Sequence, residues 1–219
     1  MRHEYRSRPL TPDDSAAISR VLEATLVAGR PLPFPVMDLP LLLEYFTEFY
    51  VTCEPEAGLI VEDEAQRVVG YGLGTTQVTE QSRWQRQAAG RLLWHWLRNW
   101  SSYDPFTRWF YRLRLLDARE TIVHPDPPLE AHFHWHLLPE VRGRWGRTIL
   151  WHFRDHAAAR GVRRFGGTVP QIESRRDPAM WSRLGGEVVH RVPHHTLTAL
   201  LGEPVSRLTV ASDVDAFHW

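Results

Sequence analysis

The chain has 219 residues, of which 43% are hydrophobic and 24% charged, a composition that suits one sizeable globular domain and excludes a wholly disordered chain. Its 26 basic and 26 acidic residues cancel to a net charge of zero, which disfavours electrostatic binding to nucleic acid or membranes. The apolar runs are far shorter than the roughly 20 residues of a membrane span, and no apolar signal segment follows Met1. A single cysteine, Cys53, forms no internal disulfide and offers no cysteine-based zinc site. We therefore expect a cytoplasmic protein without a membrane attachment.

The first part of the chain predicts a strand, two helices and a strand hairpin. Thr11 is a helix N-cap followed by Pro12 at the first helical position, and apolar residues at helical spacing continue that helix. The predicted elements are a strand at Tyr5–Leu10, helices at Pro12–Gly29 and Leu39–Tyr50, and hairpin strands at Gly58–Glu62 and Val68–Gly74.

Residues 80–128 have a different character, because arginines and tryptophans alternate through them. Apolar residues at helical spacing on both sides of Ser101–Pro105 predict two helices. The tryptophans can pack on a sheet while the arginines face water. The same pattern also suits a cap over a substrate site, or a surface for nucleic acid or a protein partner. We expect the tryptophans to pack and the arginines to influence the choice of substrate.

The second half alternates strands and helices, which is an α/β pattern. The predicted elements are a strand at Glu130–Leu138, a helix at Gly146–Arg160, a strand at Arg164–Val169, a short helix at Asp177–Leu184, and strands at Val188–Arg191 and Thr196–Leu201.

The most informative segment joins the strand that ends at Leu138 to the helix that follows it. A glycine- and arginine-rich turn between a strand and a helix directs backbone N–H groups and the positive helix end at one point, which suits a phosphate or diphosphate. Gly143 and Gly146 let the backbone approach a ligand closely. Arg142, Arg144 and Arg147 can add ionic contacts. A tight turn with solvated arginines explains the same residues without a ligand.

Arg142-Gly143-Arg144-Trp145-Gly146 resembles the diphosphate-binding signature Gln/Arg-x-x-Gly-x-Gly/Ala of the GNAT family of acyl-CoA-dependent N-acyltransferases. The predicted order of elements is similar to that family over most of the chain. The resemblance implies a mixed, mostly antiparallel α/β sheet that splays near Leu137–Leu138 and is flanked by helices. It implies a single domain at 1–208, with a helical insert at 80–128 before the fourth strand and a tail at 209–219.

Two departures from the family pattern stand out. The turn has one residue fewer than the signature, a form that also resembles divergent GNAT-like proteins carried by phages. Trp181 stands where many family members have a tyrosine that protonates the leaving thiolate, and an indole N–H is not a useful acid. Water, Tyr103 or Tyr111 would then supply that proton.

The resemblance implies that acetyl-CoA or another acyl-CoA is the co-substrate and that an amine attacks its thioester. Leu137 and Leu138 would contact the thioester and pantetheine through their backbone, and residues 142–147, including Trp145, would bind the diphosphate. Glu130 or His132 would act as the base. The acceptor would be an amine of a small molecule or a protein, and a monomer and a homodimer both stay open.

His132, His134 and His136 alternate along the same strand and therefore share one face with Glu130. A solvated strand face with stacked histidines is the simplest explanation, and a base within an acyltransferase site is the next. Three such histidines can also form part of a zinc site, but same-face neighbours about 6.6 Å apart rarely close on one ion. Two other functions thus remain: a catalytically silent GNAT-like module that binds a protein or nucleic acid, and a zinc-dependent hydrolase.

Overall fold

The computed structural model describes residues 4–143, 145–174, 181–182 and 185–216. Its centre is one sheet of seven strands in the order β1-β2-β3-β4-β5-β7-β6. All neighbouring strands are antiparallel except β4 and β5, which are parallel. The strands are β1 (Arg6–Pro9), β2 (Leu59–Glu62), β3 (Val68–Thr75), β4 (Ala131–Leu137), β5 (Arg164–Ile172), β6 (Gly186–Pro193) and β7 (Val205–Asp213). The mixed, mostly antiparallel α/β architecture expected from the sequence is confirmed.

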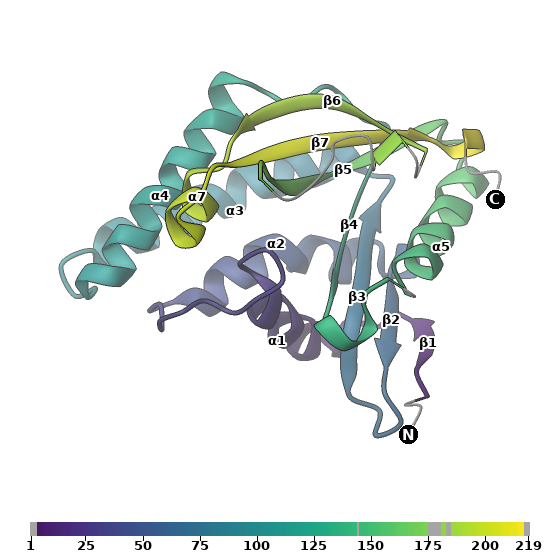
Figure 1. Ribbon diagram of the computed structural model, residues 1–219, viewed down its shortest axis with the longest axis horizontal. Helices are drawn as coiled ribbons and strands as arrows, with labels where there is room; N and C mark the ends of the chain where they lie inside the picture. The colour runs from purple at the N-terminus through teal and green to yellow at the C-terminus, as the bar shows by residue number, and fades with distance from the viewer. Residues whose placement is uncertain (1–3, 144, 175–180, 183–184, 217–219) are drawn as a thin grey trace.

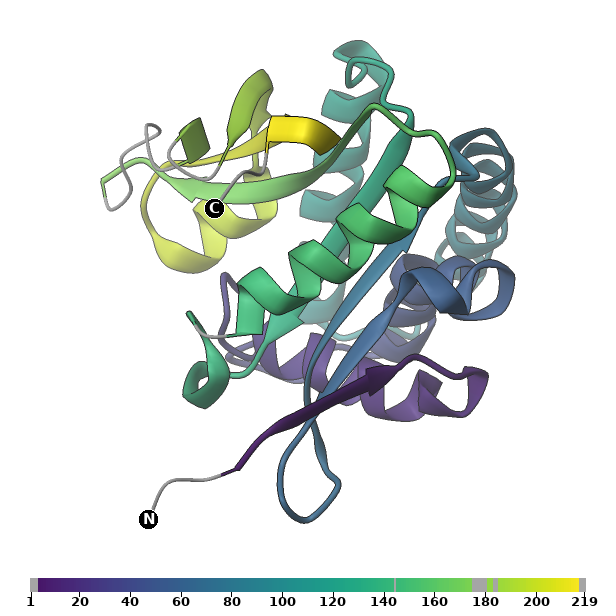
Figure 2. The ribbon, with the colours of Figure 1, turned by 90° about the vertical axis from the view of Figure 1, so that its right-hand side faces the viewer.

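Helices cover both faces of the sheet (Figures 1 and 2). One face is covered by α1 and α2, whose apolar stripes pack against Ile60, Tyr71 and Leu73 of the sheet. The other face is covered by α5, where Ile149 and Phe153 pack against the strands. The helices are α1 (Ser15–Thr25), α2 (Leu39–Cys53), α3 (Val78–Asn99), α4 (Pro105–Val123), α5 (Trp145–Ala159) and α7 (His195–Leu201).

Two glycines of β3 let α5 lie close to the sheet. A Cβ atom at Gly72 would come within 2.1 Å of Ile149, and one at Gly74 within 2.2 Å of Phe153. A larger residue at either position would have to push α5 off the sheet. The position of α5, and with it the turn at its N-terminus, therefore depends on these glycines.

The sheet divides between β4 and β5. These strands pair only at Ala131–Phe165 and His132–Gly166, and β1 to β4 then run in a different direction from β5, β7 and β6 (Figure 1). The separation begins just after His132. The family resemblance implied a later position, near Leu137–Leu138. The fourth strand therefore has an unpaired edge over most of its length.

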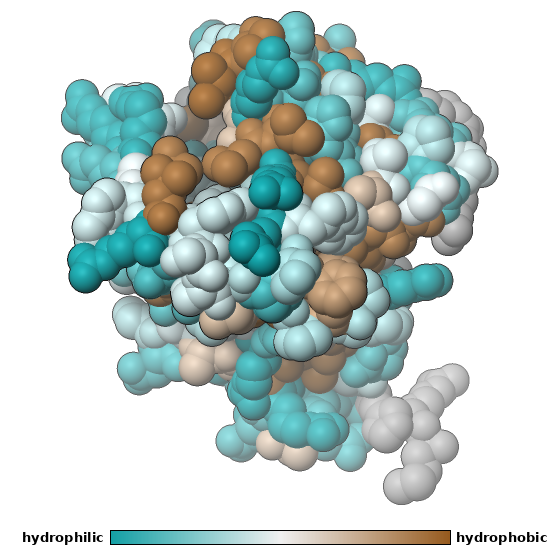
Figure 3. All heavy atoms as spheres, turned by 90° about the vertical axis from the view of Figure 1, so that its left-hand side faces the viewer, coloured by the Kyte–Doolittle hydropathy of each residue, from teal (hydrophilic) through white to brown (hydrophobic). Residues whose placement is uncertain are grey.

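The insert consists of the two expected helices, α3 and α4, separated at residues 100–104. Trp96 stacks on Tyr111 with ring centroids 4.1 Å apart, and both are buried. Trp94, Leu97 and Phe106 are instead exposed, and Figure 3 shows apolar side chains among polar ones on this side of the molecule. The expected packing of the tryptophans is thus correct for one face of the insert only. No helix within the described residues is both long and apolar enough to cross a membrane.

The segment predicted as a strand at Thr196–Leu201 is helix α7, which corrects the sequence interpretation. Asp117 of α4 accepts hydrogen bonds from the backbone N–H groups of His195 and Thr196 and thereby caps the first turn. Gly202, with φ +70°, ends the helix. The last strand is β7, so residues 209–213 of the expected tail lie in the sheet.

Glu54, which follows α2, holds α2, the end of β3 and α5 together. Its buried carboxylate accepts hydrogen bonds from Thr75 Oγ1 (2.7 Å), Thr76 N (2.9 Å), His156 Nε2 (2.8 Å) and Arg160 Nη1 (2.9 Å). Burial by itself would raise the pKa of Glu54, but the hydrogen bonds from His156, Thr75 and Thr76 outweigh it and lower the pKa to about 2. The ionised form is therefore the one that stabilises the fold.

Replacing Glu54 is expected to destabilise the protein strongly. Glu54→Ala should lower the free energy of unfolding by about 3–5 kcal/mol, because it leaves buried partners without their carboxylate. Since the folded-state pKa is depressed, the wild type should lose this contribution as pH falls from about 4.5 toward about 2. Urea unfolding measures both effects. Glu44→Ala, on the exposed side of α2, should change the value by no more than about 0.5 kcal/mol, and equal losses in both variants would contradict the assigned role.

Candidate active site

The unpaired edge of β4 exposes main-chain polar groups toward β5. Leu138 N–H donates to Val69 O of β3 (2.9 Å), and main-chain groups alternate along a strand. The N–H and C=O groups of Phe133, Trp135 and Leu137 therefore point away from β3, toward β5. Gly167 of β5 still lies close to β4, since a Cβ atom there would lie 2.0 Å from the carbonyl oxygen of Phe133. Beyond this point β5 does not pair with β4, so an extended ligand can bond to this edge.

The glycine turn lies at the end of that edge. Pro139–Val141 forms a single 3₁₀ turn, Gly143 has φ +87°, and α5 begins at Trp145. Among the described residues, a Cβ atom at Gly143 would meet nothing within 4 Å, and one at Gly146 nothing nearer than 3.9 Å. The space beside the turn is thus open to a ligand. The N-terminal end of a helix carries a partial positive charge and free N–H groups, which suit a phosphate.

The expected diphosphate ligands differ in where they point. Arg142 donates from Nε to Leu137 O (3.2 Å) and from Nη2 to Gly29 O, so its guanidinium group binds two carbonyls of the chain itself. Trp145, the first residue of α5, is buried in the hydrophobic core. Arg147 is exposed and lies over the Trp151 ring at 5.7 Å. Arg144 lies outside the described residues.

The two leucines at the end of β4 also play different parts. The N–H group of Leu138 is used within the sheet by Val69, whereas Leu137 lies at the unpaired edge. Of the two, Leu137 alone can offer an N–H group to a ligand beside β5.

Glu130 lies away from the turn, at the closed end of the β4–β5 pair. Its carboxylate accepts from the backbone N–H of Arg163 (2.7 Å) and from the Arg163 guanidinium group (3.3 Å). Hydrogen bonds from these groups lower the pKa of Glu130. The structure therefore engages this carboxylate in holding the start of β5 and does not direct it at the unpaired edge.

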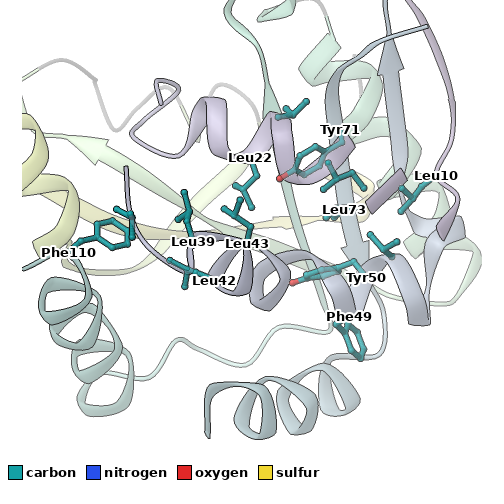
Figure 4. Close-up of a cluster of buried hydrophobic side chains, with 14 of the residues drawn as sticks. Leu10, Leu22, Leu39, Leu42, Leu43, Phe49, Tyr50, Tyr71, Leu73 and Phe110 are labelled. Carbon is teal, nitrogen blue, oxygen red and sulfur yellow. The ribbon is translucent and has the colours of Figure 1, made fainter. Parts of the chain in front are cut away.

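The three histidines of β4 face α1 and α2. His132 Nδ1 lies 2.8 Å from Tyr50 Oη, and His136 Nδ1 lies 2.8 Å from Thr25 Oγ1. His134 lies between them, and its Nε2 is buried without a hydrogen-bond partner among the described residues. Figure 4 shows Tyr50 with Tyr71 of β3 in the cluster that covers this face, their hydroxyl groups pointing to the same side.

Burial keeps these histidines neutral. It lowers the pKa of His132 and of His136 to about 4, and the pKa of His134 well below its ordinary value, because an imidazolium is poorly solvated there. The charge of Arg142 lowers the pKa of His136 further. At neutral pH each ring therefore holds one proton and has one unprotonated nitrogen.

The same histidines do not converge on a point. Their ring centroids are 5.9 Å apart from His132 to His134 and 6.2 Å apart from His134 to His136. Over the part of the chain that the structure describes, no three His, Cys, Asp or Glu side chains are arranged to hold a metal ion. The alternating spacing along the strand separates the rings, as expected for an extended backbone.

The remaining proton donors suggested by the sequence are occupied or buried. Tyr103 donates to Asp38 (2.7 Å) and Tyr111 to Met37 O (2.5 Å), so both hold the start of α2 against the insert. Trp181 is buried. Most of the predicted helix at Asp177–Leu184 falls on residues 175–180 and 183–184, outside the described residues.

Tyr50, Thr25 and Gln81 are the polar partners of this site that sequence analysis did not identify. Each lies on a helix, at a buried position among apolar neighbours. A polar side chain on the apolar face of a helix was the one available signal, but it does not reveal which distant strand supplies its partner.

No protein-family model and no curated protein matches the sequence. Solved structures do match over nearly the whole chain. A crystal structure of SsHAT shares 24% identity over 96% of this chain and 98% of its own, with a TM-score of 0.66. A polyamine N-acetyltransferase from Drosophila melanogaster shares 17% identity over 96% of this chain and 100% of its own (TM-score 0.54). The putative acetyltransferase yncA from Salmonella typhimurium, solved with acetyl-CoA, shares 16% identity over 97% of this chain and 95% of its own (TM-score 0.52).

The chain has the GNAT fold. In this GNAT fold, three features meet around β4: the unpaired main-chain edge toward β5, the glycine turn that leads into α5, and the histidine face toward α1 and α2. The fold expected from the resemblance of the turn is thereby confirmed.

The buried neutral histidines should make stability depend on pH. The unfolded chain binds protons at His132 and His136 as pH falls from about 6.5 to about 4, whereas the folded chain does not. The free energy of unfolding should therefore decrease with falling pH in this window, by at most about 1.4 kcal/mol per pH unit for each histidine. Urea unfolding of a His132→Gln/His136→Gln variant should show a shallower dependence. His124→Gln, at an exposed site, is the control, and an unchanged slope in the double variant would refute the assignment.

Proposed function

We propose that the protein is an N-acyltransferase that transfers an acetyl or other acyl group from acyl-CoA to a primary amine of a small molecule or protein. The main structural support for this function is the unpaired edge of β4, which ends at the open glycine turn before α5. A long ligand with polar groups along one arm and a diphosphate at its end suits this arrangement. Crystallisation of the similar yncA structure with acetyl-CoA supports the same co-substrate here.

The diphosphate would bind at residues 143–147, where the N–H groups of the turn and of α5 combine with the charge of Arg147. The pantetheine arm would then run back along β4 and bond to the N–H group of Leu137 and to the main-chain groups of Trp135. Residues 133–137 span about 13 Å at about 3.3 Å per residue. This length brings the thioester near Phe133, where β4 and β5 separate.

Arg142, which the sequence suggested as a diphosphate ligand, would instead hold the main chain at the end of β4. Its guanidinium group bonds to the carbonyl of Leu137 at the same edge. Acyl-CoA would have to displace this contact or bind beside it. Among the described arginines of the turn, Arg147 is thus the better candidate for contact with phosphate.

Amine attack would come from the α1 and α2 side, past the histidines that flank Phe133. The amine nitrogen forms a bond to the thioester carbonyl carbon, the carbon–sulfur bond breaks, and CoA leaves as the thiolate. Before the attack, one proton of the ammonium goes to His134, whose Nε2 has no other partner among the described residues, and this frees the nitrogen lone pair. The proton that the nitrogen loses after the attack passes through water to the CoA thiolate. His132 is bonded to Tyr50, and Glu130 to Arg163, which makes both weaker candidates for the base.

Calorimetry with acetyl-CoA and longer acyl-CoAs tests the proposal directly. Arg147→Glu should weaken binding about 10- to 100-fold, because it removes a charge-assisted contact and adds repulsion. Arg20→Glu, an equal charge change on the exposed side of α1, should leave the dissociation constant unchanged. Absence of wild-type binding to any acyl-CoA would refute the function, whereas binding without turnover on a broad amine panel would favour a catalytically silent module.

Replacement of the proposed base should separate chemistry from binding. His134→Gln is expected to lower kcat about 100-fold or more, as loss of a general base usually does, with the dissociation constant of acyl-CoA unchanged. Steady-state kinetics and calorimetry provide the two measurements. Glu130→Gln is the comparison, and a larger loss of kcat in that variant than in His134→Gln would overturn the assignment.

A further inference from the structure

The hydroxyl group of Tyr50 lies between two polar side chains. On one side is the side-chain amide of Gln81, whose Nε2 donates to Tyr50 Oη, and on the other is His132 Nδ1 at 2.8 Å. Gln81 and Tyr50 are both buried. A hydroxyl group has one hydrogen, and the amide N–H can only donate. The Tyr50 hydrogen therefore goes to His132 Nδ1.

This direction determines which tautomer His132 adopts. Burial raises the pKa of Tyr50 far above its ordinary value, so the phenol keeps its hydrogen. His132 is neutral at pH 7 because its pKa is lowered to about 4. A neutral imidazole carries one N–H, and since Nδ1 accepts a hydrogen bond, the proton must be on Nε2.

His136, on the same strand face, has the opposite arrangement. Thr25 Oγ1 donates its single hydrogen to Val21 O (2.7 Å). The 2.8 Å contact between Thr25 Oγ1 and His136 Nδ1 must then be donated by the histidine. His136 therefore carries its proton on Nδ1 and has a lone pair on Nε2.

We propose that Tyr50 and Gln81 are positioning residues that hold His132 as a hydrogen-bond donor through Nε2–H, opposite in tautomer to His136. Gln81 belongs to α3, so the insert reaches the histidine strand through this residue. One consequence rests on the proposed function. During the reaction, His132 donates a hydrogen bond to a substrate oxygen beside Phe133, while His134 accepts the proton of the acceptor amine.

Nitrogen NMR of the wild-type protein labelled with ring-¹⁵N histidine tests the tautomers without any substrate. His132→Gln and His136→Gln assign the two sets of signals by difference. We expect a protonated Nε2 and an unprotonated, hydrogen-bonded Nδ1 at His132, and the reverse at His136. A protonated Nδ1 at His132, or the same tautomer at both histidines, would overturn the proposal.

Two variants test the residues responsible. Tyr50→Phe should shift the His132 Nδ1 signal, because that nitrogen loses its donor, and should leave His136 unchanged. Gln81→Glu at pH 9 should move the His132 proton to Nδ1, because an ionised carboxylate can only accept the Tyr50 hydrogen. Thr25→Val is the matched control and should shift His136 alone. A His132 spectrum unaffected by either variant would refute the roles of Tyr50 and Gln81.

Kinetics then connect the tautomer to the reaction. Tyr50→Phe should lower kcat about 10-fold with an unchanged dissociation constant for acyl-CoA, the size expected for one hydrogen bond of about 1.4 kcal/mol. An unchanged kcat would refute the role of His132 as a donor in the reaction. Failure of the wild type to bind acyl-CoA would refute the proposed function, while the NMR result would stand on its own.

Discussion

The parallel pairing of β4 and β5 ends after two residues, and the candidate site depends on this interruption. Main-chain N–H and C=O groups need partners, and a strand edge without a neighbour offers them to a ligand. Here the interruption is stabilised from both sides, because β3 pairs with β4 from His132 to Leu137 and β7 pairs with the whole of β5. Each strand therefore keeps its shape although the two are apart. The edge is consequently a rigid surface formed before any ligand arrives.

The two faces of β4 have different roles in the candidate site: one anchors α5, and the other carries the histidines. Toward α5, Phe133 stacks on Phe153 with ring centroids 4.8 Å apart, which anchors the helix whose N-terminus ends the open turn. Toward α1 and α2, the alternate residues are histidines in a poorly solvated layer of tyrosines and leucines. Burial there removes their charge and limits each ring to one proton. Hydrogen-bond direction then decides what each ring can do.

The insert contributes to the site through packing and through a few polar contacts. Trp96 and Tyr111 join the core under α2, and Asp117 caps α7 from the other side. Arg114 is half-buried beside Asp117 and lies over the Phe46 ring at 5.3 Å, so this arginine is engaged within the protein. The insert therefore stabilises the positions of α2 and α7. Through α2, it also supports the helical layer that faces the histidines.

Local sequence determined much of this fold. The N-cap at Thr11, the glycine turn before α5 and the strict alternation of His132, His134 and His136 depend on neighbours within a few residues, and the structure has each of them. Contacts between distant segments decided the rest. Thr196–Leu201 has the composition of a strand, but Asp117, some 80 residues earlier, caps it as a helix. Glu130 binds Arg163, Arg142 binds Gly29, and His132 binds Tyr50. A side chain's partner, charge and tautomer depend on which groups the fold places against it, and no pattern in neighbouring residues contains that information.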